Sequence, residues 1–179
     1  MNVSLIACED TRSTGNLLKN LDISNKLISF HKHNSYQRLD YLISKLMEGG
    51  SIALVCDAGM PSISDPGEIL IKEARRANLD IICIPGPCAA INALVSSGLD
   101  ASRFTFYGFI PKSSKERQIT LKAISQSEIS SIVYESPKRV IKLLKDLQKS
   151  CGGSREVALL KEMTKRYEQH FGSTIDEVL

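Results

Sequence analysis

Residues 51–67, SIALVCDAGMPSISDPG, place an apolar run directly before a loop rich in glycine and proline. The run Ser51–Cys56 is typical of a strand buried on both faces of a parallel sheet. Asp65 as N-cap and Pro66 at the first helical position then predict a helix. The intervening ten residues exceed the ~2–6 residues of most βα connections. Because ligands bind at the carboxyl ends of parallel strands, this loop is the first candidate site, with an ordinary long turn as the alternative.

The rest of the chain alternates short apolar runs with helical patterns, which predicts an α/β fold with a mostly parallel sheet in its first part. Strands are predicted at residues 3–8, 27–30, 51–56, 80–84, 104–111, 131–134 and 156–160. Helices are predicted at residues 9–21, 35–47, 66–78, 87–98, 112–124, 137–149 and from Thr174 onward. These elements predict two α/β domains, residues 1–104 and 105–179, and we expect the sheet of the second to be incomplete.

The composition, with 42% hydrophobic and 24% charged residues, is ordinary for a soluble globular protein. No run approaches the ~18 apolar residues of a membrane span and no signal peptide is evident, so we predict a cytoplasmic protein without a membrane partner. The five cysteines lack metal-ligand spacing and are expected to be free thiols. The three histidines form no zinc set, and we predict no metal. The sequence also lacks the P-loop, GxGxxG and GxSxG motifs.

Positive charge is concentrated in residues 103–150, which hold ten Lys and Arg against four Asp and Glu. Residues 1–102 hold nine against eleven, so the two parts of the chain differ in sign. A basic segment on a nearly neutral protein favours a polyanionic partner, because contacts with phosphates release counterions. A solvated helix face explains the same pattern, and charge alone leaves both interpretations open.

Six motifs follow one another along nearly the whole chain. They are CEDTRSTGNLL at 8–18, DAGMPSISDPG at 57–67, PGPCAAINALVSSGL at 85–99, FYGFIPKSSKER at 106–117, YESPKRV at 134–140 and REVALLKEMTK at 155–165. In order and spacing they resemble the ribosomal RNA small subunit methyltransferase I family, in the tetrapyrrole methylase-like group. The resemblance implies two α/β domains with S-adenosylmethionine in the cleft between them. It also implies 2′-O-methylation of a decoding-site cytidine of 16S ribosomal RNA, with the small ribosomal subunit as partner. We further expect a homodimer.

Several positions depart from the family pattern. Cys56 and Met60 stand where the family usually has serine and threonine, and Lys138 where it often has histidine. Family members also begin with a further strand, a loop containing proline and glycine, and a helix, and they continue beyond the position of Leu179. We therefore expect a truncated chain, and three interpretations stay open: an RNA ribose methyltransferase, a small-molecule methylase on the same fold, or a remnant that cannot hold the cofactor.

The resemblance assigns the cofactor to two loops whose small residues allow close approach of the backbone to a ligand. The residues expected to line it are Asp57, Ala58, Gly59, Pro61, Pro85, Gly86, Pro87, Cys88, Ala89 and Ala90. Alternatively, Gly59 and Gly86 only permit turns and Asp57 only caps.

Attack by a ribose 2′-oxygen needs in-line alignment and removal of a weakly acidic proton. Candidates for that catalysis at predicted strand ends are Glu9, Asp10, Arg12, Glu135, Glu162 and Lys165. Glu9 and Asp10 could instead favour the first turn of a helix through its dipole, and Lys165 could be a solvated lysine. The sequence does not distinguish among these residues.

Overall fold

A computed structural model of the chain describes residues 3–65 and 67–179. The backbone divides into two compact units, Met1–Cys88 (unit 1) and Ala89–Leu179 (unit 2). The predicted division near residue 104 therefore differs from the observed one. The helix α4 (Ala89–Ser97) contacts β5 and β6 of unit 2, which explains why it belongs to the second unit.

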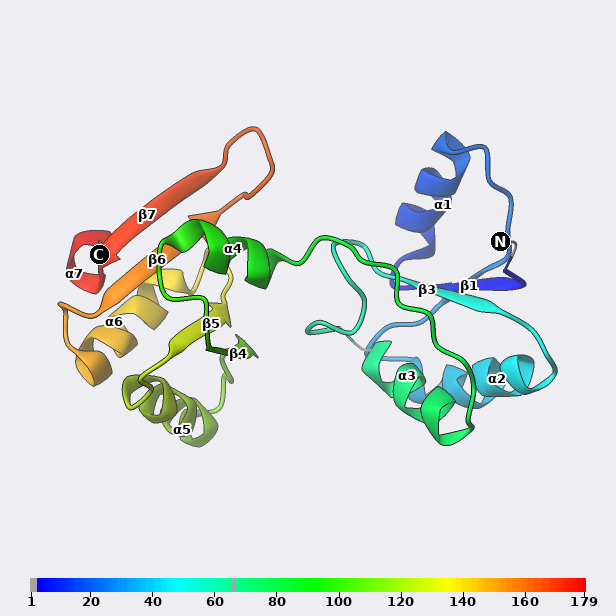
Figure 1. The fold of residues 1–179 in the computed structure, drawn as a ribbon, viewed down its shortest axis with the longest axis horizontal. Coiled ribbons are helices and arrows are strands. Elements are labelled where there is room, and N and C mark those ends of the chain that lie inside the picture. Colours follow the sequence, from blue (N-terminus) through cyan, green and yellow to red (C-terminus); the bar gives the residue numbers. More distant parts are fainter. Residues whose placement is uncertain (1–2, 66) are drawn as a thin grey trace. The chain divides into compact units, whose positions relative to one another are not determined.

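Unit 1 is built on a parallel sheet in the order β2-β1-β3 (Figure 1). Its strands are β1 (Leu5–Cys8), β2 (Leu27–Ser29) and β3 (Ile52–Val55), and its helices are α1 (Thr11–Asn20), α2 (Ser35–Met47) and α3 (Gly67–Arg76). The helices α2 and α3 pack against each other below the sheet as drawn, and α1 lies above it. The core on the α2 and α3 side is formed by Leu5, Ala7, Phe30, Leu42 and Leu70. The predicted parallel α/β arrangement is confirmed.

Two predictions for unit 1 are wrong. The strand buried throughout is β1, whereas β3 is half-buried and, among the described strands, pairs only with β1. Residues 80–84 do not form a strand, and the side chains of Ile82 and Ile84 are 74% and 81% exposed. A strand needs a neighbouring edge for its hydrogen bonds, and none of the described strands pairs with this run. The predicted role of Pro66 at the start of α3 lies outside the described residues.

Unit 2 contains two small sheets and the helices α4, α5 (Ser114–Ser125), α6 (Val140–Cys151) and α7 (Ile175–Val178). The strands β4 (Phe104–Phe109) and β5 (Ser130–Tyr134) are parallel, while β6 (Glu156–Lys161) and β7 (Gln169–Thr174) form an antiparallel hairpin. The core joins Ile110, Leu121, Leu143, Leu147 and Ile175. Sequence reasoning missed β7, because QHFGST alternates weakly and contains a glycine.

Local caps explain where the helices of unit 2 begin. The hydroxyl of Ser113 accepts from the N–H of Glu116, whose carboxylate accepts from that hydroxyl in turn, which starts α5 near the predicted position. Thr174 accepts from the N–H of Glu177 and caps α7 as predicted. By contrast, α6 begins at Val140 rather than at residue 137, because the preceding residues form a turn that bonds Arg139 N–H to the Ser136 carbonyl.

Candidate functional site

The carboxyl ends of β1 and β3 lie at one edge of the unit 1 sheet. The two strands are parallel and in register, with Cys8 beside Val55. Glu9 and Asp10 follow β1 and Asp57 follows β3, so these residues leave the sheet at the same edge. Burial raises the pKa of the Cys8 thiol, and the negative charges of Asp57 and Asp10 add to that effect. These residues therefore lie at one edge of the unit 1 sheet.

The two predicted cofactor loops meet in unit 1. Gly59 has a φ of +78°, and a Cβ there would lie 2.9 Å from the carbonyl oxygen of Pro87. A Cβ on Gly86 would lie 3.4 Å from Cγ of Met60. Glycine at position 59 is thus required both by the left-handed backbone and by the close approach of the second loop. The two loops, far apart in sequence, form one closely packed backbone surface.

The loop that follows β3 is stabilised by bonds within itself. The Cys56 thiol donates to the carbonyl oxygens of Ala58 and Gly59, at 3.5 and 3.1 Å. Burial raises the pKa of this thiol, and the charge of Asp65 raises it further. A thiol held protonated is a poor nucleophile. Cys56 therefore supports the turn rather than supplying a reactive group.

Three residues of this loop were not singled out from the sequence. Ser62 and Ser64 adopt left-handed backbone conformations, with φ of 70° and 60°. A Cβ on Gly67 would lie 2.8 Å from both Cδ2 of Leu54 and Oγ of Ser62. Strained non-glycine residues of this kind are concentrated at functional sites. The pattern S-x-S-D-P-G was the available signal, but positive φ at serine is not readable from sequence.

Asp10 is the N-cap of α1 and is paired with Arg12. Its carboxylate accepts from the Arg12 backbone N–H at 2.8 Å and from the guanidinium at 2.7 Å. The side-chain bond from Arg12 is the main reason that the pKa of Asp10 falls to about 2, and the backbone bond contributes next. A carboxylate with so low a pKa is a weak general base. Asp10 and Arg12 therefore have a structural explanation, while Glu9 is exposed beside them.

Ala89 and Ala90 belong to unit 2, where they begin α4. The buried N–H of Ala90 donates to the Tyr134 hydroxyl at 3.0 Å. The Tyr134 ring packs edge-on against Phe106 and tilted against Phe109, with centroids 5.0 and 5.5 Å apart. Because this ring lies at the end of β5, it fixes the start of α4 relative to the strand. The motifs PGPCAA and YESPKR thus contact each other through unit 2.

Glu135 is the most buried of the predicted catalytic residues, with 4% of its side chain exposed. Its Oε1 accepts from the Ser136 N–H and from Nε of Arg139, each at 2.8 Å. Its Oε2 is buried and has no hydrogen-bond partner within residues 3–65 and 67–179. Buried polar atoms are nearly always paired. Among the six predicted catalytic residues, Glu135 is therefore the one with a buried acceptor oxygen that the described residues leave unpaired.

Glu162 and Lys165 lie in the turn of the β6–β7 hairpin and are exposed. Their charged groups are 3.3 Å apart, and the side chains are 44% and 67% exposed. Such a solvated pair contributes little to stability. The structure therefore pairs these two predicted catalytic residues with each other.

The basic segment divides into paired and exposed cations. Arg117 on α5 forms a two-bond ion pair with Asp146 on α6, at 3.0 and 2.8 Å, and is only 14% exposed. Arg139 is held by Glu135. Both therefore have structural roles. The exposed cations are Arg103 and seven lysines, namely Lys112, Lys115, Lys122, Lys138, Lys142, Lys145 and Lys149.

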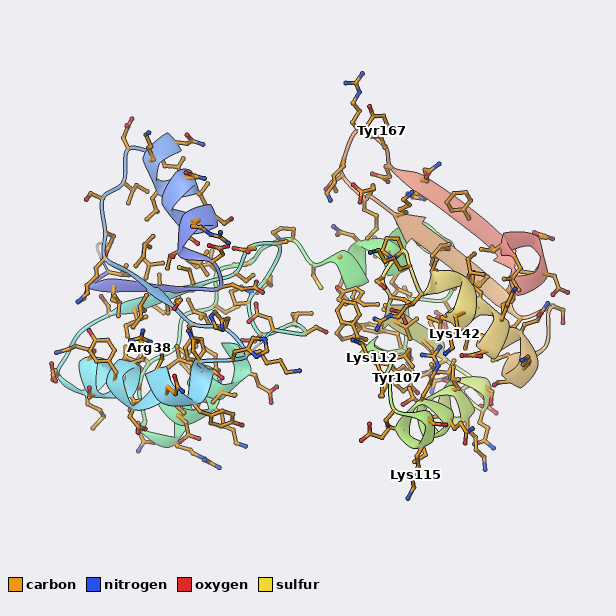
Figure 2. The ribbon with its side chains drawn as sticks, turned by 180° about the vertical axis from the view of Figure 1, so that it is seen from behind. Arg38, Tyr107, Lys112, Lys115, Lys142 and Tyr167 are labelled. Atoms are coloured by element: carbon orange, nitrogen blue, oxygen red, sulfur yellow. The ribbon has the colours of Figure 1, made fainter. Side chains whose placement is uncertain are left out.

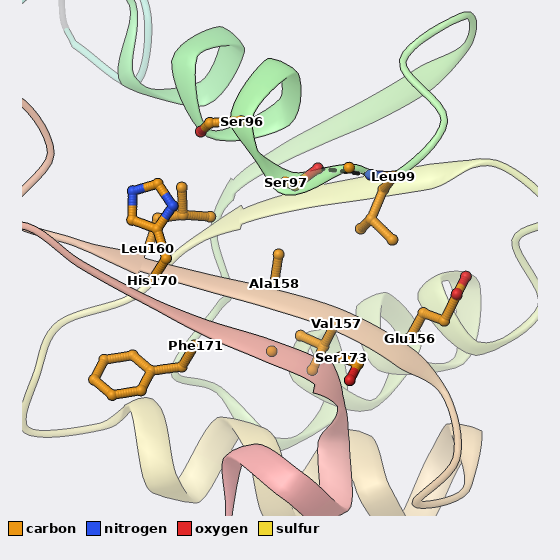
Figure 3. A pocket seen from close by; sticks show the side chains of 12 residues that line it. Ser96, Ser97, Leu99, Glu156, Val157, Ala158, Leu160, His170, Phe171 and Ser173 are labelled. Carbon is orange, nitrogen blue, oxygen red and sulfur yellow. Dashed lines mark hydrogen bonds between the residues drawn. The ribbon is translucent and has the colours of Figure 1, made fainter.

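A pocket of about 310 Å³ lies between the C-terminal end of α4 and the β6–β7 hairpin (Figure 3). None of the predicted cofactor residues lines it. The hydroxyls of Ser96 and Ser97 donate to helix carbonyls at 2.7 Å, so they are already satisfied. The part of the chain that the structure describes contains no set of three metal-ligating side chains, and none of its helices is long and apolar enough to span a membrane.

A family model described as tetrapyrrole (corrin/porphyrin) methylases matches residues 2–179. The chain belongs to this family. Curated members of similar sequence are named ribosomal RNA small subunit methyltransferase I. The protein from Vibrio cholerae is 45% identical over 99% of this chain, and that from Escherichia coli O157:H7 is also 45% identical over 99%. The protein from Synechocystis is 44% identical over 99%.

The chain spans 62% of the length of the first two of these relatives and 63% of the length of the third. Solved structures show the same fold. The methyltransferase CobJ superposes with a TM-score of 0.67 at 14% identity, covering 100% of this chain and 89% of that one. The cobalt precorrin-4 methyltransferase CbiF gives 0.65 at 14% identity, covering 98% and 76%. The predicted fold class and family resemblance are confirmed.

Proposed function

We propose that this chain is the S-adenosylmethionine-binding and RNA-contacting part of a small-subunit ribosomal RNA methyltransferase. The observation that carries the proposal is its 45% identity, over 99% of its length, to a protein named for that activity. The site residues fall inside this matched region. The finer reaction, methylation of a cytidine 2′-oxygen at the decoding site of 16S ribosomal RNA, is part of the same proposal. We also propose that the protein forms a homodimer, which light scattering would test, and that it is cytoplasmic.

The paired loops of unit 1 supply the surface for the cofactor. When bound, S-adenosylmethionine supplies an electrophilic methyl group on a sulfonium. The backbone of residues 57–61 and 85–88 packs so closely that a single Cβ on Gly59 would clash with Pro87. Such a surface offers amides and carbonyls without intervening side chains.

Glu135 is the carboxylate that we assign to the ribose hydroxyl. Its Oε1 is fixed by Arg139 and Ser136, so its Oε2 is held in place to accept a hydrogen bond. An acceptor at the hydroxyl would orient the attacking oxygen and receive its proton. Asp10 is less suitable because its pairing with Arg12 lowers its pKa to about 2.

Methyl transfer from labelled S-adenosylmethionine to purified small ribosomal subunits tests the proposal. We expect label in 16S ribosomal RNA at a ribose, and Glu135→Gln should slow transfer by ~10²–10⁴-fold while leaving cofactor affinity unchanged. Asp10→Asn is the matched control and should retain most activity. No label in RNA under conditions where calorimetry shows bound cofactor would contradict the proposed substrate.

The exposed lysines provide a second test. Replacing Lys112, Lys115 and Lys142 together by alanine should weaken binding to small subunits and reduce the salt slope by ~0.7–0.9 for each phosphate that is no longer neutralised. Figure 2 shows these three residues on unit 2. Arg117 is left out of this variant because it forms an ion pair with Asp146. The control replaces Lys19, Lys26 and Lys72 of unit 1, which removes the same charge. Equal salt slopes for the two variants would mean that the basic segment is only a solvated surface and does not contact RNA.

A tetrapyrrole methylase is the second candidate, because the family model that matches residues 2–179 is described as tetrapyrrole (corrin/porphyrin) methylases. The solved structures of CobJ and CbiF, at 14% identity, support the fold alone. The same labelled cofactor offered with a tetrapyrrole in place of ribosomal subunits separates the two. Transfer to the tetrapyrrole and none to RNA would favour this candidate.

A further inference from the structure

The turn between β6 and β7, residues 162–168, is a compact structure with a strained backbone. Glu162 and Thr164 have φ of 53° and 64°, a conformation that side chains other than glycine rarely adopt. Backbone bonds link Lys165 N–H to the Glu162 carbonyl at 3.0 Å and Glu168 N–H to the Lys165 carbonyl at 3.2 Å. The Glu168 carboxylate accepts from the Thr164 N–H at 2.6 Å. The turn is thus ordered by its own bonds.

This turn presents an arginine stacked on an aromatic ring. The guanidinium carbon of Arg166 lies 5.6 Å from the centroid of the Tyr167 ring, within the range of a cation–π contact. The Tyr167 side chain is 71% exposed, and Figure 2 shows it at the tip of the hairpin, beyond the ends of both strands. An exposed ring of this size contributes nothing to the core of unit 2. The ring is therefore accessible to a partner outside the unit.

The charges of the turn leave Arg166 available. Glu162 pairs with Lys165, and Glu168 is held by the Thr164 N–H and by His170 at 2.7 Å. Within residues 3–65 and 67–179 no ion pair involves Arg166. Both carboxylates of the turn are therefore compensated. The outermost surface of the hairpin is a cation and a π face side by side.

We propose that Arg166 and Tyr167 form a stacking platform for an unpaired base of the RNA substrate. Sequence-tolerant recognition of single-stranded RNA relies on aromatic side chains and guanidinium planes that stack on bases, with cations that contact the backbone. The turn offers one aromatic ring and one guanidinium in a preordered loop, so little conformational entropy is lost on binding. This inference rests on the proposed function, which identifies the bound nucleic acid as ribosomal RNA. A protein partner fits less well, because residues 164–170 around the ring are polar or charged and exposed.

Binding of a fluorescently labelled oligocytidine of about ten nucleotides, within the usual range of site sizes, tests the proposal on the chain as it stands. Tyr167→Ala should weaken binding about tenfold, because stacking on one base is lost. Tyr167→Phe keeps the ring and should bind like the wild type. Arg166→Lys keeps the charge but loses the planar face, so its loss should be intermediate. Tyr36→Ala is the matched control, since Tyr36 is 76% exposed on unit 1.

The variants also separate failure of this inference from failure of the proposed function. The inference is overturned if the wild-type chain does not bind the oligocytidine, if Tyr167→Ala binds as tightly as Tyr36→Ala, or if Tyr167→Ala changes only the oligomeric state. The proposed function fails differently: small subunits receive no methyl group and the lysine variants keep the wild-type salt slope, while oligocytidine binding still depends on the ring of Tyr167.

Discussion

Residues 51–56 and 80–84 are two apolar runs of unit 1, and each leads into a loop with glycine and proline. Only the first contains a strand: β3 pairs with β1 over four residues, whereas residues 80–84 pair with none of the described strands. Leu54 of β3 packs against the core, while Ile84 is 81% exposed. An apolar run therefore predicts an extended segment, but whether it joins a sheet depends on an available edge.

Shortening one side chain in each run should produce the largest difference in the free energy of unfolding. Leu54→Ala should lower the free energy of unfolding by about 2–3 kcal/mol, because it removes packing against the core of unit 1. Ile84→Ala should change it by no more than ~0.5 kcal/mol, as expected for an exposed side chain. Urea unfolding followed by circular dichroism measures both. An equal cost for the two substitutions would mean that residues 80–84 are packed as a strand in solution.

The sequence predicted the α/β class, β1 to β3 and the helices of unit 1. These features depend on local patterns and on the geometry of parallel strands, which place consecutive loops at one edge. The failures have a different origin. Burial of β1 rather than β3 and the unpaired state of residues 80–84 depend on strand order. The left-handed serines, Ser62 and Ser64, depend on tertiary contacts, and no residue type signals them.

For the candidate site, sequence reasoning found the residues but not their roles. Six residues were equivalent candidates for catalysis, since a charged residue at a strand end has the same pattern whether it caps, pairs or reacts. The structure separates them by partner: Asp10 is paired with Arg12, and Glu162 with Lys165. Glu135 differs because one of its oxygens is buried without a partner among the described residues.

A substitution at the contact between the two loops should have the next largest effect. Gly59→Ala should destabilise unit 1 by about 2 kcal/mol, because left-handed backbone costs ~1–2 kcal/mol for other residues and the new Cβ would meet the Pro87 carbonyl at 2.9 Å. It should also weaken binding of S-adenosylmethionine, as measured by calorimetry. Gly49→Ala is the control, because Gly49 has φ of +86° but nothing lies within 4 Å of its added Cβ.

The control isolates the loop contact from backbone strain. Gly49→Ala should cost about 1 kcal/mol and leave cofactor affinity unchanged. If both variants lose the same stability and bind cofactor equally, residues 85–88 do not approach Gly59 in solution. The second apolar run would then be independent of the first along its whole length.

The smallest expected effect concerns the end of β1, next to the same sheet edge. The pKa of Asp10 falls from 3.8 to about 2, chiefly because its carboxylate accepts from the Arg12 side chain. A depressed pKa stabilises the fold above the unfolded-state value and loses that contribution as the pH falls through the folded-state value. Asp10→Asn keeps an N-cap oxygen but removes the charge. The stability difference between wild type and this variant should be constant above about pH 4 and decline toward pH 2. Urea unfolding from pH 6 to pH 2.5 measures it, and a difference that does not change with pH would show that Asp10 acts as a cap alone.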